Sequence, residues 1–487
     1  RYIEARYVDD IDREELADQV INNLLEQLDP HSNYISSKQL KEVNEQLEGN
    51  FEGIGIEFML LEDTIRVISP IAGGPSEAVG VLAGDKIVEI EDSLVAGVEI
   101  KNRDIISMLR GKKGTKVDVG ILRGLEDKVR TFTITRDEIP LHSIDVSIMV
   151  DKETGYIKVN RFSANTYKEF MEGLENLISK HEMKNLVIDV RQNPGGYLQE
   201  ATKILSQLFD EKGKLLVYTE GRTTHRNDYE TTGKPFFDID QIAVLIDEGS
   251  ASASEILAGA IQDWDRGVIV GRRSFGKGLV QEQYGLKDGA ALRLTVARYY
   301  TPSGRSIQKD YDDREEYDQD VFDRYENGEL LSADSIDITD TTKYRTEKGR
   351  IVYGGGGISP DIFTPIDSLV FNEHYIELRQ QVPQYVYAYV DERREIFDQS
   401  LDQFMRSFRV DSELIEDFVA FATKNGVESN PRELARCKDR LKLMIKSRIA
   451  RHLYQEEGLY RVLNEEDPAV LKALDAFYGT NPLVLEK

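Results

Sequence analysis

The chain of 487 residues lacks the side chains for several common kinds of site. Its single cysteine, Cys437, excludes an internal disulfide and a zinc site built from several cysteines. No apolar run approaches the ~20 residues that a membrane-spanning helix needs. Positive charge is also scarce, because 62 lysine and arginine residues stand against 88 acidic ones, a net charge of −26. An acidic surface of this kind repels phosphate backbones, so we expect no nucleic-acid partner.

Hydrophobic residues make up 40% of the sequence, which is enough to build cores and excludes wholesale disorder. Residues 1–48 are predicted to be largely helical, and residues 50–138 read as a small β-rich module. Residues 139–370 alternate strands with helices, and residues 371–487 return to helical spacing. The predicted fold is therefore a multidomain α/β architecture.

The acidic residues are unevenly distributed, and ten of them fall among the twenty residues 310–329. We predict that this stretch belongs to a solvated insertion, residues 309–347, within the α/β region. The overall negative charge is also typical of a surface that serves solubility alone.

Three serines, Ser250, Ser252 and Ser254, stand at alternate positions between a predicted strand at 242–246 and a predicted helix at 254–262. Free N–H groups at the start of a helix can stabilise the oxyanion of an acyl-transfer reaction, so a serine here is a candidate nucleophile. The alternative is a capping box, S-x-x-E, at residues 252–255, and the residues alone favour this structural role. The two roles can coincide, and the sequence pattern does not choose among the serines.

The candidate base is Lys277, because none of the six histidines lies in a catalytic motif and no G-x-S-x-G elbow is present. A lysine acts as a base only when it is neutral, which requires burial away from carboxylates. If the strand predicted at 279–283 begins at Lys277, Gln281 faces the same side and can orient the amine. The alternative is a surface lysine between Gly276 and Gly278.

Residues 271–278 nearly match the consensus of a phosphate-binding loop, G-x-x-x-x-G-K-S/T. Gly278, however, stands where a Ser or Thr must hold magnesium, and a predicted strand follows instead of a helix. We therefore do not expect a nucleotide-hydrolysing enzyme.

Two glycine-rich turns are candidate binding elements. Gly195 and Gly196 follow a predicted strand at 186–190 and can offer N–H groups to an oxyanion, although an ordinary turn has the same pattern. The run Gly53-Ile54-Gly55-Ile56 leads into a strand, where backbone N–H groups can bind the C-terminal carboxylate of a peptide. A hairpin glycine pair is the simpler alternative for this run.

Taken together, these motifs resemble the carboxyl-terminal processing proteases, the S41 family of serine endopeptidases. The resemblance spans most of the chain and includes four core motifs in the expected order. It rests on Tyr7 to Asp9, Leu28 to Ser32, Gly53 to Ile56, Gly84 to Ile87, Asp189 to Gly196, Gly249 to Glu255, Ser274 to Gln281 and Ala297 to Arg305.

The resemblance implies a PDZ domain at 50–138, a ClpP/crotonase-like protease core at 139–370, and helical regions at 1–48 and 371–487. It also implies a Ser-Lys dyad in which Ser252 is the nucleophile, Lys277 the general base and Gln281 its orienting partner. The oxyanion hole would use Ala253 together with Gly195 or Gly196. No metal or cofactor is expected.

The expected substrates are proteins with flexible C-terminal tails, which the PDZ domain would recruit through Gly53, Ile54, Gly55 and Ile56. The first residue is Arg1 and not methionine, so we expect that an export signal has been removed and that the protein acts in the periplasm or elsewhere outside the cytoplasm. Two rival hypotheses are a catalytically silent PDZ scaffold and acyl-thioester chemistry on a related fold.

Overall fold

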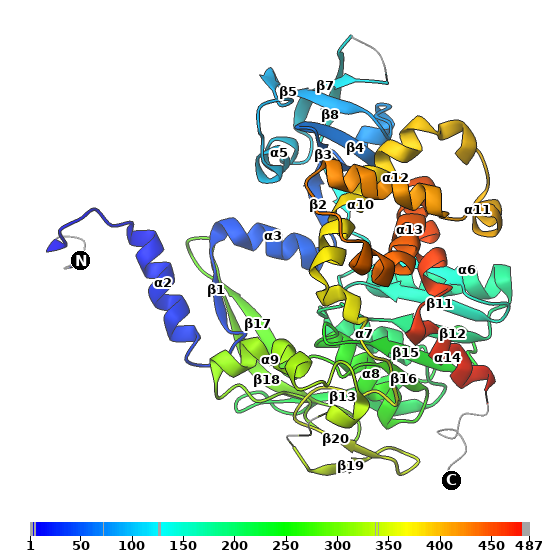
Figure 1. Cartoon of the computed structure of the whole chain (residues 1–487). Coiled ribbons are helices and arrows are strands. Elements are labelled where there is room, and N and C mark those ends of the chain that lie inside the picture. The colour runs from blue at the N-terminus through cyan, green and yellow to red at the C-terminus, as the bar shows by residue number, and fades with distance from the viewer. Residues whose placement is uncertain are drawn as a thin grey trace. The chain divides into compact units, whose positions relative to one another are not determined.

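The computed structural model describes residues 3, 6–71, 73–124, 128–336, 338 and 340–479. The ends of the predicted terminal regions, residues 1–2, 4–5 and 480–487, lie outside this description. The chain divides into two compact units, and each is built from separated segments (Figure 1). Unit 1 comprises residues 1–48, 142–367 and 464–487, and unit 2 comprises residues 49–141 and 368–463.

Unit 1 is centred on a six-stranded sheet in the order β10-β11-β12-β15-β16-β21. The pair β10–β11 is antiparallel, and every other pair in this sheet is parallel. The central strands are continuous apolar runs, as expected for a sheet that is covered on both faces. The strands are β10 (Ile144–Met149), β11 (Thr154–Val159), β12 (Asn185–Asp189), β15 (Ile242–Ile246), β16 (Val268–Gly271) and β21 (Ile362–Phe363).

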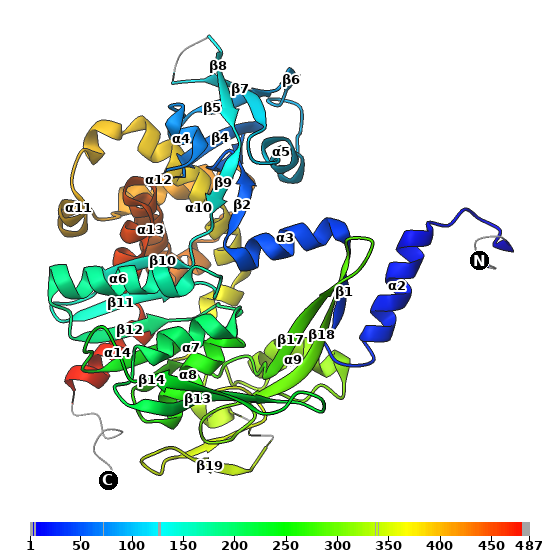
Figure 2. The ribbon, with the colours of Figure 1, turned by 180° about the vertical axis from the view of Figure 1, so that it is seen from behind.

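One face of this sheet packs on three helices, α6 (Thr166–His181), α7 (Leu198–Ser206) and α8 (Ala253–Asp263). Alternate strand residues such as Ile188 and Val244 belong to this core. Helix α14 (Pro468–Tyr478), from the end of the chain, packs on strands β12, β15 and β16 (Figure 2). Sequence reasoning predicted the alternating strands and helices, and the α/β fold class is confirmed.

A second sheet in unit 1 contains a long hairpin. Its strand order is β1-β18-β13-β14, with β17 pairing on β18. Helices α2 (Arg13–Leu25) and α3 (Ser37–Glu48) flank β1 in the sequence. The strands are β1 (Asn33–Ile35), β13 (Lys212–Glu220), β14 (Asn227–Thr232), β17 (Leu279–Gly285) and β18 (Ala291–Tyr300).

The predicted solvated insertion is partly wrong, because its helix α9 (Arg314–Glu326) carries a buried face. Tyr317, Arg324 and Glu329 are at most 6% exposed, and Lys309 is also 6% exposed. The acidic side chains dominate the composition, but the buried residues pair among themselves and with the loop before Lys277. Strand β19 (Lys343–Arg345) lies within the insertion and pairs with β20 (Ile351–Tyr353), which follows it.

Unit 2 joins a β-rich domain to a helical one. The β-rich domain has a sheet in the order β3-β4-β5-β7-β8 with β6 on β5, and a separate pair β2–β9. Its elements are β2 (Asn50–Gly53), β3 (Ile56–Leu61), β4 (Thr64–Pro70), α4 (Pro75–Ala78), β5 (Lys86–Ile90), β6 (Ser93–Leu94), α5 (Asn102–Leu109), β7 (Lys116–Leu122), β8 (Arg130–Thr135) and β9 (Asp137–Pro140).

The helical part of unit 2 has its own apolar core, distinct from the core of the β-rich domain. The two parts also touch, since Arg451 pairs with Glu57 of β3 at 3.2 Å. Among the described residues, no helix is both long enough and apolar enough to cross a membrane. The helices are α10 (Glu373–Glu392), α11 (Leu401–Ser407), α12 (Ser412–Lys424) and α13 (Pro431–Asn464), the last kinked at Tyr454 and Gln455.

Candidate active site

Three neighbouring parallel strands of unit 1 bring the predicted catalytic segments together. Strand β12 leads into the Gly195-Gly196 turn, β15 into the serine motif, and β16 into the loop that carries Lys277. Because the carboxyl ends of parallel strands lie at one edge of a sheet, these segments meet there. Ser252, Lys277, Gln281, Gly195 and Gly196 all line one cleft of about 880 Å³.

The structure distinguishes the three serines, which the sequence pattern left equivalent. Ser250 and Ser254 are fully buried, and their hydroxyls donate to the carbonyl oxygens of Val190 at 2.8 Å and Asn193 at 2.9 Å. Ser252 alone is partly exposed and lines the cleft. Two serines therefore support the motif, and one lines the cleft.

Ser252 precedes helix α8 in a strained backbone conformation, with φ +55° and ψ −114°. A positive φ at a residue with a side chain costs on the order of 1–3 kcal/mol, and such strain is common at functional sites. The N–H of Ser252 donates to Glu255 Oε2 at 2.8 Å, so the glutamate half of the predicted capping box is formed.

Glu255 is a shared acceptor that sequence reasoning treated only as a capping residue. Its Oε1 accepts from Ser274 Oγ at 2.5 Å and from the Gly276 N–H at 2.7 Å, and its Oε2 also accepts from the Lys277 N–H at 2.8 Å. Complete burial raises the pKa of Glu255 to about 7, although the four donors act in the opposite direction. One carboxylate thus links the backbone of Ser252 to the backbone of Lys277.

The Lys277 side chain has the environment that a neutral amine needs. Burial and the charge of Arg293 lower its pKa from 10.5 to about 8, while Glu255 and Asp29 act weakly in the opposite direction. Within the described part of the chain, no carboxylate forms an ion pair with its Nζ. Lys277 was predicted to lie away from carboxylates, whereas Glu255 and Asp29 are near enough to act on its pKa and are outweighed by burial and Arg293.

Gln281 lies in the cleft, but its amide contacts Thr295 Oγ1 at 3.4 Å. Strand β17 begins at Leu279 and not at Lys277, and its register shifts between Val280 and Gln281. Across the described residues no hydrogen bond joins Gln281 to the amine of Lys277. The predicted orienting role of Gln281 stays a prediction.

Asp29, in the turn Leu28 to Ser32, reaches this site from the N-terminal region. It accepts from the Ser32 hydroxyl at 2.6 Å and from Thr295 Oγ1 at 3.0 Å, which places it beside β18. His31 in the same turn bonds to Tyr317 Oη at 2.7 Å, and burial together with the charge of Lys277 lowers its pKa to about 4. The predicted turn was identifiable in the sequence, but its contact with β18 is not local.

The Gly195-Gly196 turn packs closely on the serine motif. A Cβ atom on Gly195 (φ +96°) would lie 2.7 Å from Ser252 Cβ, and one on Gly196 (φ +140°) would lie 2.1 Å from the Phe162 carbonyl oxygen. Both positions therefore require glycine. The Gly195 N–H donates to Asn193 Oδ1 at 2.9 Å, whereas no described residue accepts from the Gly196 N–H.

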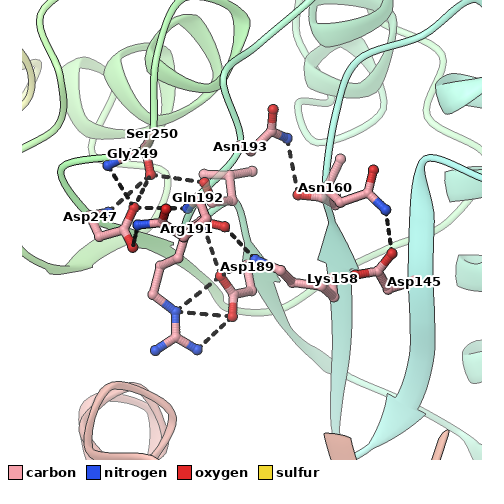
Figure 3. Close-up of polar contacts among 12 residues, drawn as sticks. Asp145, Lys158, Asn160, Asp189, Arg191, Gln192, Asn193, Asp247, Gly249 and Ser250 are labelled. Atoms are coloured by element: carbon pink, nitrogen blue, oxygen red, sulfur yellow. Dashed lines mark hydrogen bonds and ion pairs between the residues drawn. The ribbon is translucent and has the colours of Figure 1, made fainter. Parts of the chain in front are cut away.

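A buried ion network holds the start of this turn (Figure 3). Asp189 accepts from Tyr156 Oη at 2.7 Å and pairs with Lys158 and Arg191 at 3.2 and 2.6 Å. Burial raises the pKa of Asp189, but Arg191 and Lys158 outweigh burial and hold the pKa well below its usual range. Arg191 also pairs with Asp467, at the start of α14, at 2.9 Å.

Tyr299, on β18, contacts the backbone of the two segments that contain Ser252 and Lys277. Its buried hydroxyl donates to the Ser252 carbonyl oxygen at 3.1 Å and also contacts the Lys277 carbonyl oxygen. Through Tyr299, the motif Ala297 to Arg305 therefore contacts the backbone of both candidate catalytic residues.

In unit 2, the predicted peptide-binding run forms the loop between β2 and β3. The Ile54 carbonyl oxygen is occupied by the Ser76 N–H and hydroxyl. Among the described residues, no acceptor takes the N–H groups of Ile54 and Gly55. Strand β3, which begins at Ile56, is an edge strand of its sheet. Across the described ranges, no group of three His, Cys, Asp or Glu side chains is placed to hold a metal ion.

Three protein-family models match three different segments of the chain. Peptidase family S41 matches residues 153–315, the PDZ domain matches residues 53–135, and a family of unknown function matches residues 375–455. A carboxy-terminal-processing protease of Bartonella bacilliformis is 38% identical over 312 residues, which are 63% of this chain and 70% of that protein. The chain belongs to peptidase family S41. The resemblance that the sequence motifs indicated is therefore confirmed.

Other relatives of this S41 peptidase carry similar names. The carboxy-terminal processing protease CtpB of Bacillus subtilis is 36% identical over 63% of this chain and 64% of its own length. The structure of a photosystem II D1 C-terminal processing protease is 26% identical, with a TM-score of 0.39, over 74% of this chain and 85% of that one. A PDZ domain of a carboxy-terminal protease from Vibrio cholerae, solved with a peptide, is 31% identical, with a TM-score of 0.18, over 19% of this chain and 99% of that one.

Proposed function

We propose that this S41 peptidase is a serine endopeptidase that cleaves protein substrates near their C-termini through a dyad of Ser252 and Lys277. The observation that carries the proposal is the meeting, in one cleft, of the single accessible serine of the motif and a lysine whose pKa is about 8. A lysine with that pKa is neutral often enough near neutral pH to accept a proton.

The proposed reaction follows acyl-enzyme chemistry. Neutral Lys277 takes the proton of the Ser252 hydroxyl as the oxygen attacks the substrate carbonyl, and a tetrahedral oxyanion forms. The protonated lysine returns its proton to the leaving amine, so the peptide bond breaks and an acyl-enzyme remains. Water then attacks the ester with Lys277 again as base, which releases the second product and restores the serine.

The oxyanion would be stabilised by the N–H groups of Ala253 and Gly196. Ala253 is the first residue of α8, so its N–H has no partner within the helix. Of the two predicted glycines, Gly195 already donates to Asn193, which leaves Gly196 as the better candidate. Losing one such donor typically costs about 10²–10³ in kcat.

The PDZ domain would recruit the C-terminal tail of the substrate. The free N–H groups of Ile54 and Gly55 suit a terminal carboxylate, and the edge strand β3 can pair with the tail by strand addition. We also propose an extracytoplasmic location, which rests on the family resemblance.

The decisive experiment is cleavage of a disordered test protein by wild type, Ser252→Ala and Lys277→Ala, with products identified by terminal sequencing. Ser254→Ala serves as a matched control, because its hydroxyl bonds to the backbone and does not face the cleft. We expect cleavage near the C-terminus that both dyad variants abolish without loss of folding. Wild-type rates in either dyad variant would contradict the mechanism.

The alternative function is a catalytically silent PDZ scaffold that binds protein C-termini. The free N–H groups of the β2–β3 loop support binding equally well in that case. Binding of C-terminal peptides with no cleavage under any condition would favour the scaffold.

A further inference from the structure

No Asp or Glu side chain lines the cleft around Ser252, although 88 of the 487 residues are acidic and the charges of Asp29 and Glu255 reach Lys277. Its lining includes three cationic side chains, Arg161, Lys277 and Arg293, among neutral polar and apolar residues. The cleft is therefore positively charged within a chain of net charge −26. Low-dielectric walls concentrate such a field on whatever enters the cleft.

Arg293 lies beside the catalytic lysine on the β17–β18 hairpin. It faces Gln283 across the hairpin, and the pair of Gln281 and Thr295 lies two residues, roughly 7 Å, further along the strand. Its Nη2 donates to Gln283 Oε1 at 3.1 Å. No carboxylate in the described part of the chain forms an ion pair with Arg293.

Arg161 lines the same cleft. It immediately precedes Phe162, whose N–H donates to the Gly195 carbonyl oxygen at 2.9 Å. The Nε of Arg161 donates to Asn160 Oδ1 at 3.0 Å, and Arg161 has no ion-pair partner among the described residues. Both arginines thus line the cleft that holds Ser252 and Lys277, and Arg161 adjoins the residue that bonds to Gly195.

We propose that the cleft selects polypeptide segments that carry a carboxylate close to the scissile bond, with Arg293 as the principal specificity-determining residue. The inference rests on the proposed function and adds a substrate class to it. A carboxylate beside these arginines would form charge-assisted hydrogen bonds that the protein itself leaves unmade. A lysine or arginine at the same place would meet like charge and be disfavoured.

The carboxylate can come from an Asp or Glu side chain or from the end of the substrate chain. A disordered reporter is therefore first cleaved by wild type, and its cleavage site is mapped by mass spectrometry. Glu, Gln and Lys are then placed singly at each of the three positions on either side of the site. Each peptide is prepared with a free and an amidated C-terminus, and kcat/KM is measured for each.

We expect Glu peptides to exceed Gln peptides by about 10-fold and Lys peptides by more, as for charge pairs that are partly desolvated. If Glu, Gln and Lys peptides with a free C-terminus are instead cleaved equally and amidation lowers kcat/KM for all of them, the substrate's own terminus supplies the carboxylate, and the proposal still holds. Arg293→Gln should remove most of the preference, and Arg293→Glu should reverse it toward Lys. Arg161→Gln should have a smaller effect of the same sign.

Arg298→Gln is the matched control, because Arg298 is exposed on the same strand and does not line the cleft. It should leave the preference unchanged. Arg293 also lowers the pKa of Lys277, so the readout is the ratio of Glu to Lys kcat/KM at each pH, which cancels the effect on the base.

Two kinds of failure are distinguishable. One failure is that Glu, Gln and Lys peptides are cleaved equally, with no difference between free and amidated C-termini, while Ser252→Ala still inactivates the enzyme. That result would overturn the carboxylate preference alone. Cleavage that persists in Ser252→Ala would instead overturn the proposed function. An unchanged Glu-to-Lys ratio in Arg293→Gln would overturn the assignment of Arg293.

Discussion

At the scale of the residue, one buried carboxylate aligns the two proposed catalytic groups. Glu255 accepts four hydrogen bonds, two of them from the backbone N–H groups of Ser252 and Lys277. Such an arrangement tolerates neither a lost oxygen nor an added donor, because each unsatisfied buried group costs about 1–3 kcal/mol.

Glu255→Gln tests this arrangement. In either orientation the amide –NH₂ of the glutamine faces two groups that donate to Glu255, either those of Ser274 and Gly276 or those of Ser252 and Lys277. Hydrogen-bond donors would then lie opposite another donor. We expect about 1–3 kcal/mol of lost stability by chemical denaturation and a fall in kcat of at least about 10-fold. Ser274→Ala, which removes one of the four donors, should lower kcat less. A glutamine variant with wild-type kcat would contradict the positioning role.

The pH dependence of kcat/KM reports on the base. Lys277 is active when neutral, and its pKa is lowered to about 8, so kcat/KM should rise with pH and level off above that value. Arg293→Gln removes a positive charge that holds this pKa down, so the rising limb should move to higher pH. A profile that falls between pH 7 and 9 would exclude lysine as the base. Measurements from pH 6 to 10 at low substrate concentration decide the point.

Sequence reasoning reached these residues unevenly. The residue types and their spacing marked Ser252 and Lys277 as candidates, but only the family resemblance preferred Ser252 over Ser250 and Ser254. The structural reason is burial of the flanking hydroxyls, which depends on contacts with Val190 and Asn193 about sixty residues away. Spacing along the chain carries no information about such contacts.

At the scale of the element, helix α9 supports the loop that carries the base. Arg324 donates to the carbonyl oxygens of Ser274 at 3.2 Å and Arg273 at 2.6 Å. Its Nε and the side chain of Arg273 share the carboxylate of Glu329. The composition of this segment predicted solvation because most of its acidic residues lie on the exposed face, whereas the buried face depends on a few long side chains.

Arg324→Lys tests the support that α9 provides. Lysine keeps the charge but cannot reach two carbonyl oxygens and Glu329 in the planar geometry of a guanidinium. We expect kcat to fall by about 10-fold, because small displacements of catalytic groups are costly. Arg314→Gln on the exposed part of the same helix should leave kcat unchanged, since its pair with Asp318 is solvent-exposed. Equal kcat values in Arg324→Lys and Arg314→Gln would contradict the support of the Lys277 loop by α9.

At the scale of the whole molecule, each compact unit is assembled from separated segments. Helix α14 packs on the sheet of unit 1, and Asp467 at its start pairs with Arg191 of the oxyanion turn. Helices were correctly expected in the described residues 371–479, but periodicity does not say which core a helix covers. Hydrophobic patterning fixes the face of a helix and leaves its partner undetermined.

Asp467→Asn tests the docking of α14. Asparagine keeps the Oδ1 atom that caps the helix through the Ala469 N–H, but it loses the charge that pairs with Arg191. We expect a stability loss of about 1–3 kcal/mol, which calorimetry can measure as a lower melting temperature. Hydrogen exchange should increase in the turn that contains Gly195 and Gly196. Asp475→Asn, at an exposed position of the same helix, should change neither quantity.

The pair of Arg191 and Asp467 spans 276 positions of the chain. A ribosome releases the chain from its N-terminus, so the oxyanion turn, the serine motif and the lysine all emerge long before α14 does. During synthesis the turn therefore lacks one of its ion-pair partners and one of the helices on its sheet. The order of synthesis thus leaves this turn incomplete until helix α14 has been made.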